Sequence, residues 1–126
     1  MMTGKKLLLA AVLIALPVAA LQAMTVAVFL EKADALKSRG ALAMFSSDLR
    51  LLKGEVQTAA AAVRAERLAA ERAGRRPAFC PPGAGGRFDS DELLRHFRAF
   101  PAAQRARMEV RDGLRSLLVR KYPCPA

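Results

Sequence analysis

Two cysteines, one histidine and a group of three carboxylates are the side chains of this 126-residue chain that could do chemistry. Cys80 and Cys124 could form a disulfide or, together with His96, bind a metal ion. Three ligands without a CxxC or HxxxH spacing make a poor zinc signature, because structural zinc is held by four ligands that usually come in such pairs. The metal site is therefore the weaker of the two interpretations.

His96 is the only histidine, and hence the one side chain expected to act as a general base near neutral pH. Glu92 lies four residues before it, which predicts a surface ion pair on a helix. Asp89, Asp91 and Glu92 stand where a helix should begin, and capping explains their positions. The chain has no GxGxxG, CxxCH or EF-hand pattern. We therefore expect neither enzymatic activity nor a bound cofactor or metal.

A glycine-rich segment follows Cys80 and contains Gly83, Gly85 and Gly86. It lacks the GxxxxGK[ST] pattern of a phosphate-binding loop, and no predicted strand precedes it. We interpret it as a connector that a disulfide at Cys80 holds in place.

The start of the chain has the layout of a secretory signal. Residues 1–6 carry two lysines and no acid, and the uncharged stretch Leu7–Leu21 follows, interrupted by Pro17. A basic start followed by an apolar stretch that ends near small residues is typical of signal peptides. The sequence therefore predicts export.

Cleavage after Ala23 would divide the chain into a signal peptide, residues 1–23, and a single helical domain, residues 24–126. A cut after Ala20 is an alternative. Because residues 24–30 continue the apolar stretch, an uncleaved anchor of bilayer-spanning length is also open. The domain is expected in the periplasm, either released or anchored in the inner membrane and facing the periplasm.

The expected domain is strongly basic. The whole chain has a net charge of +10, and removal of residues 1–23 takes away two lysines and no acid, which leaves 19 basic and 11 acidic side chains and +8. In an envelope compartment the counter-charges within reach are anionic lipid, cell-wall polymer or an acidic protein. Nucleic acid is not expected, because only seven aromatic residues are present and most are needed for the core.

Export also bears on the two cysteines. An oxidising compartment preserves disulfides, so we predict that Cys80 and Cys124 are bonded to each other. Closing this loop of 45 residues would stabilise the fold by about 4 kcal/mol in the chain-entropy model.

Apolar residues recur at helical spacing along the whole domain, and no strand-like alternation lasts long enough to predict a sheet. We predict an all-α fold, a small bundle of four to five helices with one long central helix and one disulfide. The expected elements are a helix over Thr25–Ser38, a short apolar turn over Ala41–Phe45 with buried contacts, the long helix Asp48–Ala73, a helix from Asp89 or Ser90 to Phe100, a short helix or corner over Pro101–Arg107, and a last helix over Glu109–Lys121.

Arginines are concentrated on the long helix, at its exit and in the C-terminal half of the chain. The planar guanidinium group suits recognition of carboxylates at a protein interface. The residues expected to contact a partner are Arg75 and Arg76 at the exit of the long helix and Gly83, Gly85, Gly86 and Arg87 in the loop.

The C-terminal half resembles the Rap/Tai immunity family. The likeness covers Phe79 to Cys124 and consists of Cys80-Pro81-Pro82, a capped helix with Leu93, Leu94 and Phe97, a helix-starting Pro101, a last helix with Val110, Leu114, Leu117 and Leu118, and the closing Tyr122-Pro123-Cys124. Members are small exported α-helical bacterial proteins that block peptidoglycan amidases delivered by the type VI secretion system. Residues 24–76 lack the glycine-rich and cysteine-bearing segments of many members.

The resemblance implies the same Cys80–Cys124 pairing and leaves a monomer and a homodimer open. It favours a non-enzymatic periplasmic protein that binds a cell-wall hydrolase, with residues 83–87 as the loop that would enter the hydrolase cleft. A basic structural or stress protein of the envelope, associated with anionic membrane or cell-wall polymer, is the alternative.

Overall fold

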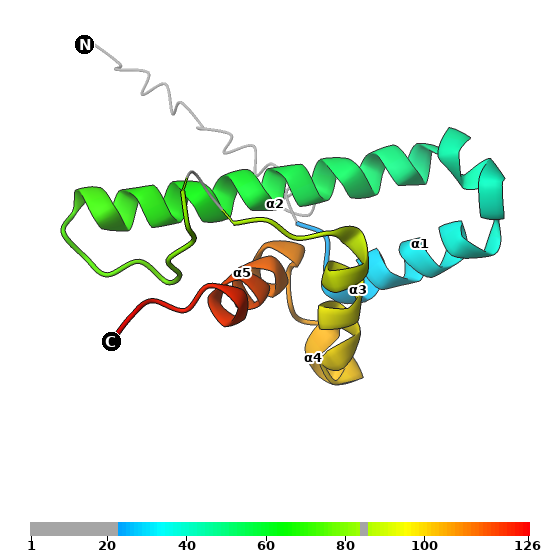
Figure 1. Cartoon of the computed structure of the whole chain (residues 1–126). Helices are drawn as coiled ribbons and strands as arrows, with labels where there is room; N and C mark the ends of the chain where they lie inside the picture. Colours follow the sequence, from blue (N-terminus) through cyan, green and yellow to red (C-terminus); the bar gives the residue numbers. More distant parts are fainter. Residues whose placement is uncertain (1–22, 84–85) are drawn as a thin grey trace, which may run out of the picture.

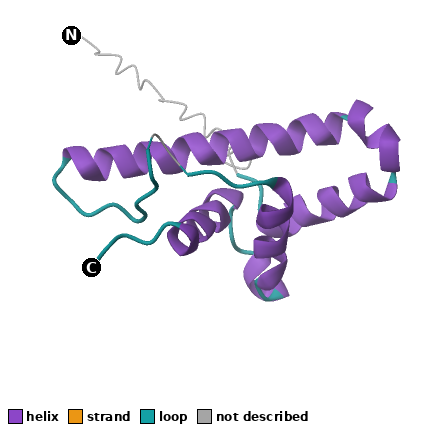
Figure 2. Cartoon of the chain, in the orientation of Figure 1, coloured by secondary structure: helices purple, strands orange, loops and turns teal. Residues whose placement is uncertain are grey.

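The computed structural model describes residues 23–83 and 86–126 and shows an all-helical chain (Figure 1, Figure 2). Its elements are, in chain order, α1 (Val26–Ser38), the 3-10 helix η2 (Gly40–Phe45), α2 (Ser47–Arg72), α3 (Ser90–Ala99), α4 (Ala102–Arg105) and α5 (Val110–Lys121). The prediction of an all-α bundle with one long helix and a disulfide is confirmed. The predicted signal peptide, apart from Ala23, lies outside the described residues.

The boundaries of α1 follow from two residues beside it. The Oγ1 atom of Thr25 accepts a hydrogen bond from the backbone N–H of Val28 at 3.2 Å, which satisfies a donor that the first turn leaves free. After α1, Gly40 has a φ of 59°, a left-handed conformation that residues with a Cβ rarely adopt. The chain can therefore turn sharply into η2.

Local capping likewise sets both ends of α2. Ser46 accepts a hydrogen bond from the backbone N–H of Asp48 at 3.2 Å, and Gly74, with a φ of 69°, follows the last turn. The 26 residues of α2 span about 39 Å at 1.5 Å per residue. Despite this length, no helix in the described ranges is apolar enough over sufficient residues to cross a bilayer.

The core lies where α1 and α5 pack on α2, and α3 packs on α1 and α5. Phe97 and Leu114 are fully buried, and the ring of Phe97 meets that of Phe29 edge to face, with 5.5 Å between the centroids. The apolar face predicted for α5 is confirmed, since all of its members are buried: Val110, Leu114, Leu117 and Leu118.

The first residues of α1 and α5 are joined through their backbones. The N–H of Val26 donates to the carbonyl oxygen of Met108 at 2.8 Å, and the N–H of Val110 donates to that of Met24 at 3.0 Å. This short bridge places the start of α1 beside α5, although more than 80 residues of chain separate them.

The α1–α2 hairpin extends beyond the other helices, and η2 is at its far end (Figure 1). The long helix therefore projects at its N-terminal end, together with α1. The helix α5 packs along α2 and does not reach η2. At the far end of the hairpin the helices therefore form two layers, α1 and α2, instead of three.

The prediction that residues 41–45 make buried contacts is wrong. No residue of η2 is buried, and Leu42, Met44 and Phe45 are 75%, 78% and 88% exposed. The apolar composition suggested a core segment, but η2 packs only on the ends of α1 and α2. Both helices run away from it toward the core, so no other described element can cover it.

Candidate functional site

Cys80 and Cys124 are joined by a disulfide, as predicted. Beside this bond the backbone N–H of Cys80 donates to the carbonyl oxygen of Tyr122 at 2.8 Å. The guanidinium group of Arg76 donates to the carbonyl oxygens of Cys124 at 3.1 Å and Pro125 at 2.5 Å. The chain after α5 is therefore fixed to the segment after α2, and neither sulfur is free to act as a nucleophile or a metal ligand.

The glycine-rich loop is anchored on α5 at its second end. The backbone N–H of Arg87 donates to the phenolic oxygen of Tyr122 at 3.0 Å, and that hydroxyl donates to the Arg87 carbonyl at 3.1 Å. A Cβ atom on Gly86 would lie 2.7 Å from Cε2 of Tyr122, so this close approach requires glycine. Gly83 is exposed with a φ of 65°, and Gly85 lies outside the described residues.

The predicted partner-binding residues line two neighbouring hollows. One, of about 300 Å³, is lined in part by Gly86 and Arg87, and the other, of about 270 Å³, in part by Arg75 and Arg76. Arg67 lines both. The structure thus brings each pair together, and the two hollows share Phe79 as well as Arg67.

The predicted surface pair between His96 and Glu92 is wrong. Glu92 instead lies 2.9 Å from Nζ of Lys121, and Nε2 of His96 lies 3.2 Å from Oγ of Ser116. Burial, and after it the positive charge of Arg120, lower the pKa of His96 below its usual 6.5, while Glu92 acts in the opposite direction. Glu92 and His96 are four residues apart on one helix, as predicted, but the carboxylate of Glu92 pairs with the ammonium group of Lys121 on α5.

A serine beside a histidine is the first part of a nucleophilic dyad, but such a base also needs a group that orients it. In the described chain no carboxylate hydrogen-bonds the imidazole of His96, which instead meets the ring of Phe100 edge to face at 5.1 Å. The contact with Ser116 therefore satisfies a half-buried side chain.

Of the three carboxylates at the start of α3, that of Asp89 acts as the cap. A side-chain oxygen of Asp89 accepts a hydrogen bond from the backbone N–H of Glu92 at 2.8 Å, as the sequence predicted. In residues 23–83 and 86–126 no three His, Cys, Asp or Glu side chains converge as metal ligands would. The described residues thus offer no built position for a metal ion.

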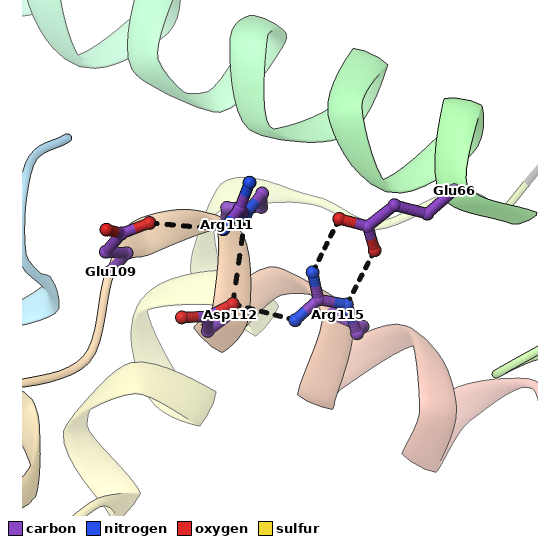
Figure 3. A network of polar contacts seen from close by, with 5 residues as sticks. All are labelled: Glu66, Glu109, Arg111, Asp112 and Arg115. Atoms are coloured by element: carbon purple, nitrogen blue, oxygen red, sulfur yellow. Dashed lines mark hydrogen bonds and ion pairs between the residues drawn. The ribbon is translucent and has the colours of Figure 1, made fainter. Parts of the chain in front are cut away.

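A network of ion pairs joins α5 to α2 (Figure 3). The guanidinium of Arg115 donates to both carboxylate oxygens of Glu66, at 2.9 Å and 2.7 Å, and to Asp112 at 2.7 Å. These hydrogen bonds, that to Glu66 above all, raise the pKa of Arg115. Arg111 lies between Glu109, at 3.5 Å, and Asp112, at 3.8 Å. Because these three carboxylates pair with arginines within the network, they do not neutralise basic side chains on the rest of the surface, which keeps the excess positive charge.

An open apolar groove of about 480 Å³ lies between α1, α2 and the start of α3. It is lined by Phe29, Ala33, Leu36, Leu49, Leu52, Lys53, Val56, Gln57, Phe88, Ser90 and Leu94. Among these residues, Leu49, Val56 and Leu94 are only half-buried. One signal could have revealed the groove: the apolar faces of α1 and α2 continue beyond the length that the shorter C-terminal helices can cover.

No protein-family model, curated protein or solved structure matches this chain. What remains for a functional inference is the groove, the distribution of charge, and the sequence resemblance of residues 79–124.

Proposed function

We propose that the chain is an exported protein that binds another protein and catalyses no reaction. We further propose that its partner is a peptidoglycan amidase, which it inhibits as an immunity protein would. The observation that carries the first proposal is the apolar groove between α1, α2 and α3. The identity of the partner rests on the resemblance of residues 79–124 to the Rap/Tai family.

The groove has the composition of a protein interface. Its walls are apolar, and the polar side chains that line it are few, namely Lys53, Gln57 and Ser90. Protein interfaces combine an apolar centre with a polar rim, and most of their binding energy comes from a few side chains that lose their water there. A partner could place one or two large apolar side chains against Leu49, Val56 and Leu94.

Charge favours an acidic partner. The 19 basic side chains outnumber the 11 acidic ones over residues 24–126. Several carboxylates are already engaged in ion pairs, as Glu66 and Glu92 are. The surplus of basic side chains would attract an acidic protein toward the domain and raise the rate of association.

The test uses the tagged protein as bait in an envelope extract of the producing cells, washed at high salt. A packed interface keeps its partner under these conditions, whereas association through surface charge is lost as screening increases. The expected result is a peptidoglycan hydrolase in stoichiometric amount, whose digestion of purified sacculi is blocked at a one-to-one ratio. Recovery of no hydrolase, or of one whose activity is unchanged, would contradict the proposal.

A matched pair of variants assigns the binding to the groove. Leu94→Glu places a charge in the groove, and Val119→Glu places the same charge on an exposed apolar position of α5 outside it. We expect Leu94→Glu to weaken hydrolase binding by about a hundredfold or more, and Val119→Glu to change it by less than about threefold. Circular dichroism must show both variants folded. Equal affinities would exclude the groove, and a small apolar molecule found there by native mass spectrometry would replace the protein as its ligand.

A further inference from the structure

The end of the α1–α2 hairpin exposes three large apolar side chains, Leu42, Met44 and Phe45, and we call residues 40–45 the hairpin tip. Single exposed apolar side chains are ordinary on protein surfaces, but three within four consecutive residues form a patch. In Figure 1 the tip points away from α5 and from the C-terminal segment that the disulfide holds. No described element covers it.

Positive charge surrounds the hairpin tip at the ends of α1 and α2. The exposed cations are Lys37, Arg39, Arg50 and Lys53, all within about two helical turns of the tip. The acids within the same distance of the tip are Asp34, which lies 2.6 Å from Arg98, and Asp48, which lies 3.5 Å from Lys32, so both are partly neutralised. An apolar end is thus followed by a cationic collar, which these four residues define.

We propose that the hairpin tip inserts into the surface of a bilayer that contains anionic phospholipid. Apolar side chains of interfacial segments reach the boundary between headgroups and acyl chains, while lysine and arginine extend toward the phosphates. Negatively charged lipid attracts each basic residue that comes close to the surface. The arrangement, with the three exposed apolar side chains in the tip and the collar on the helices that lead to it, matches this depth profile.

Charge also argues against a second copy as the occupant. Two tips that met end to end would bring two cationic collars together, and like charges repel. The insertion is independent of the groove and of any amidase, so it goes beyond the proposed function. A variant at Leu94 would affect the groove and leave the tip unchanged.

Tryptophan fluorescence tests the insertion directly, because the chain contains no tryptophan. Phe45→Trp places the sole indole at the tip, and Val119→Trp places it on α5, at a position 39% exposed, as the control. The full chain, as recovered from the envelope of expressing cells, is titrated with phosphatidylcholine vesicles with and without phosphatidylglycerol. The indole at position 45 reports its own surroundings, so its blue shift and its quenching report contact of the tip with lipid, whichever segment holds the chain on the vesicle.

With phosphatidylglycerol vesicles we expect a blue shift for Phe45→Trp and quenching by lipids brominated in their acyl chains. Vesicles of phosphatidylcholine alone should give at least about tenfold weaker partitioning, since each basic residue near an anionic surface contributes. Val119→Trp should show neither effect. Absence of the shift at position 45, or equal shifts at both positions, would overturn the proposal, as would a shift without vesicles that grows with protein concentration, which would indicate self-association.

Two charge variants in the Phe45→Trp background then locate the electrostatic part. Lys37→Gln, Arg39→Gln and Arg50→Gln together remove three charges from the collar, none of them on a residue that lines the groove. Arg64→Gln, Arg72→Gln and Arg75→Gln remove three exposed charges from the C-terminal half of α2 and the segment just after it. The first set should weaken partitioning into phosphatidylglycerol vesicles by about tenfold or more, and the second should change it by less than about threefold. Equal losses would mean that net charge, and not the tip, governs binding.

Discussion

Gly113 of α5 lies against the ring of Phe97 of α3 so closely that a Cβ atom on the glycine would be 2.7 Å from Cε1 of the ring. The same Cβ would be 3.1 Å from Cγ2 of Val26 on α1. Phe97 and Val26 are both fully buried and have no space into which to move. Three helices therefore meet at this one residue, which stands at helical spacing with Val110 and Leu117 on the buried face of α5.

Replacement of this glycine should destabilise the fold. Gly113→Ala forces a methyl group into a filled core, which typically costs about 1–3 kcal/mol, and the better helix propensity of alanine recovers at most about 1 kcal/mol. Gly54→Ala is the matched control, because it is also a helical glycine and a Cβ there has no heavy atom within 4 Å. Urea unfolding followed by circular dichroism should show a lower free energy of unfolding for Gly113→Ala and a higher one for Gly54→Ala. Changes of the same sign in both would contradict this packing.

Reduction of the disulfide should lower stability substantially. Cys80 and Cys124 are 44 positions apart, and closing a loop of this length is expected to stabilise the fold by up to about 4 kcal/mol through the denatured chain. Addition of dithiothreitol should therefore shift the urea midpoint to lower concentration. The double variant Cys80→Ser with Cys124→Ser should start from this low midpoint and show no response to the reductant. A midpoint that reductant leaves unchanged in the natural chain, with thiol labelling complete, would refute the prediction.

The paired hydrogen bonds between Arg115 and Glu66 should contribute modestly to stability. The two side chains are 29% and 44% exposed, and ion pairs in such positions contribute about 0.2–1 kcal/mol. A double-mutant cycle with Arg115→Gln and Glu66→Gln should give a coupling energy in this range that decreases as salt is added. The same cycle on Arg111 and Glu109, which are 3.5 Å apart, should give a smaller value. A larger coupling at Arg111 would show that the geometry in Figure 3 does not set the strength of these pairs.

Stability should fall as the solution is acidified through the titration of His96. Burial and Arg120 lower its pKa in the folded chain below 6.5, so the unfolded chain binds the proton more tightly. The contribution of His96 is therefore fully present above pH 6.5 and is lost as the pH falls through the folded-state pKa. Because there is one histidine in the chain, its imidazole resonances can be titrated by NMR without ambiguity.

Two variants check this assignment. Arg120→Gln should raise the folded-state pKa of His96 toward 6.5, since it removes the second cause of the shift. His96→Gln should remove this part of the pH dependence of unfolding. A folded-state pKa at or above 6.5 in the natural chain would contradict the prediction, because it would mean that Glu92 outweighs burial and Arg120.

The ends of the helices and the disulfide could be predicted from the sequence because they depend on short-range chemistry. Thr25, Ser46 and Asp89 each accept a hydrogen bond from the first turn of the helix that follows, and Gly40 and Gly74 adopt the left-handed conformation after α1 and α2. The cysteines needed no geometry either, since a chain with two cysteines allows one internal pairing.

The loop at residues 86 and 87 could be predicted only in part. The sequence indicated that Gly86 and Arg87 belong to an accessible glycine-rich segment. It did not show that the ring and hydroxyl of Tyr122 contact the backbone of these two residues. If this loop moved to enter a hydrolase cleft, the contacts of Gly86 and Arg87 with Tyr122 would therefore have to break.

Which apolar residues are exposed, and which charged side chains pair with each other, depended on the tertiary structure alone. A run such as residues 41–45 is apolar enough for a core, and whether it is covered depends on which distant helices reach it. Lys121 is distant in sequence from Glu92, yet it takes the carboxylate that helical spacing had assigned to His96. Helical periodicity tells which residues share a face, because it is a property of one segment. Whether that face becomes core, groove or exposed tip is decided by the lengths and crossing of separate helices, which no local pattern contains.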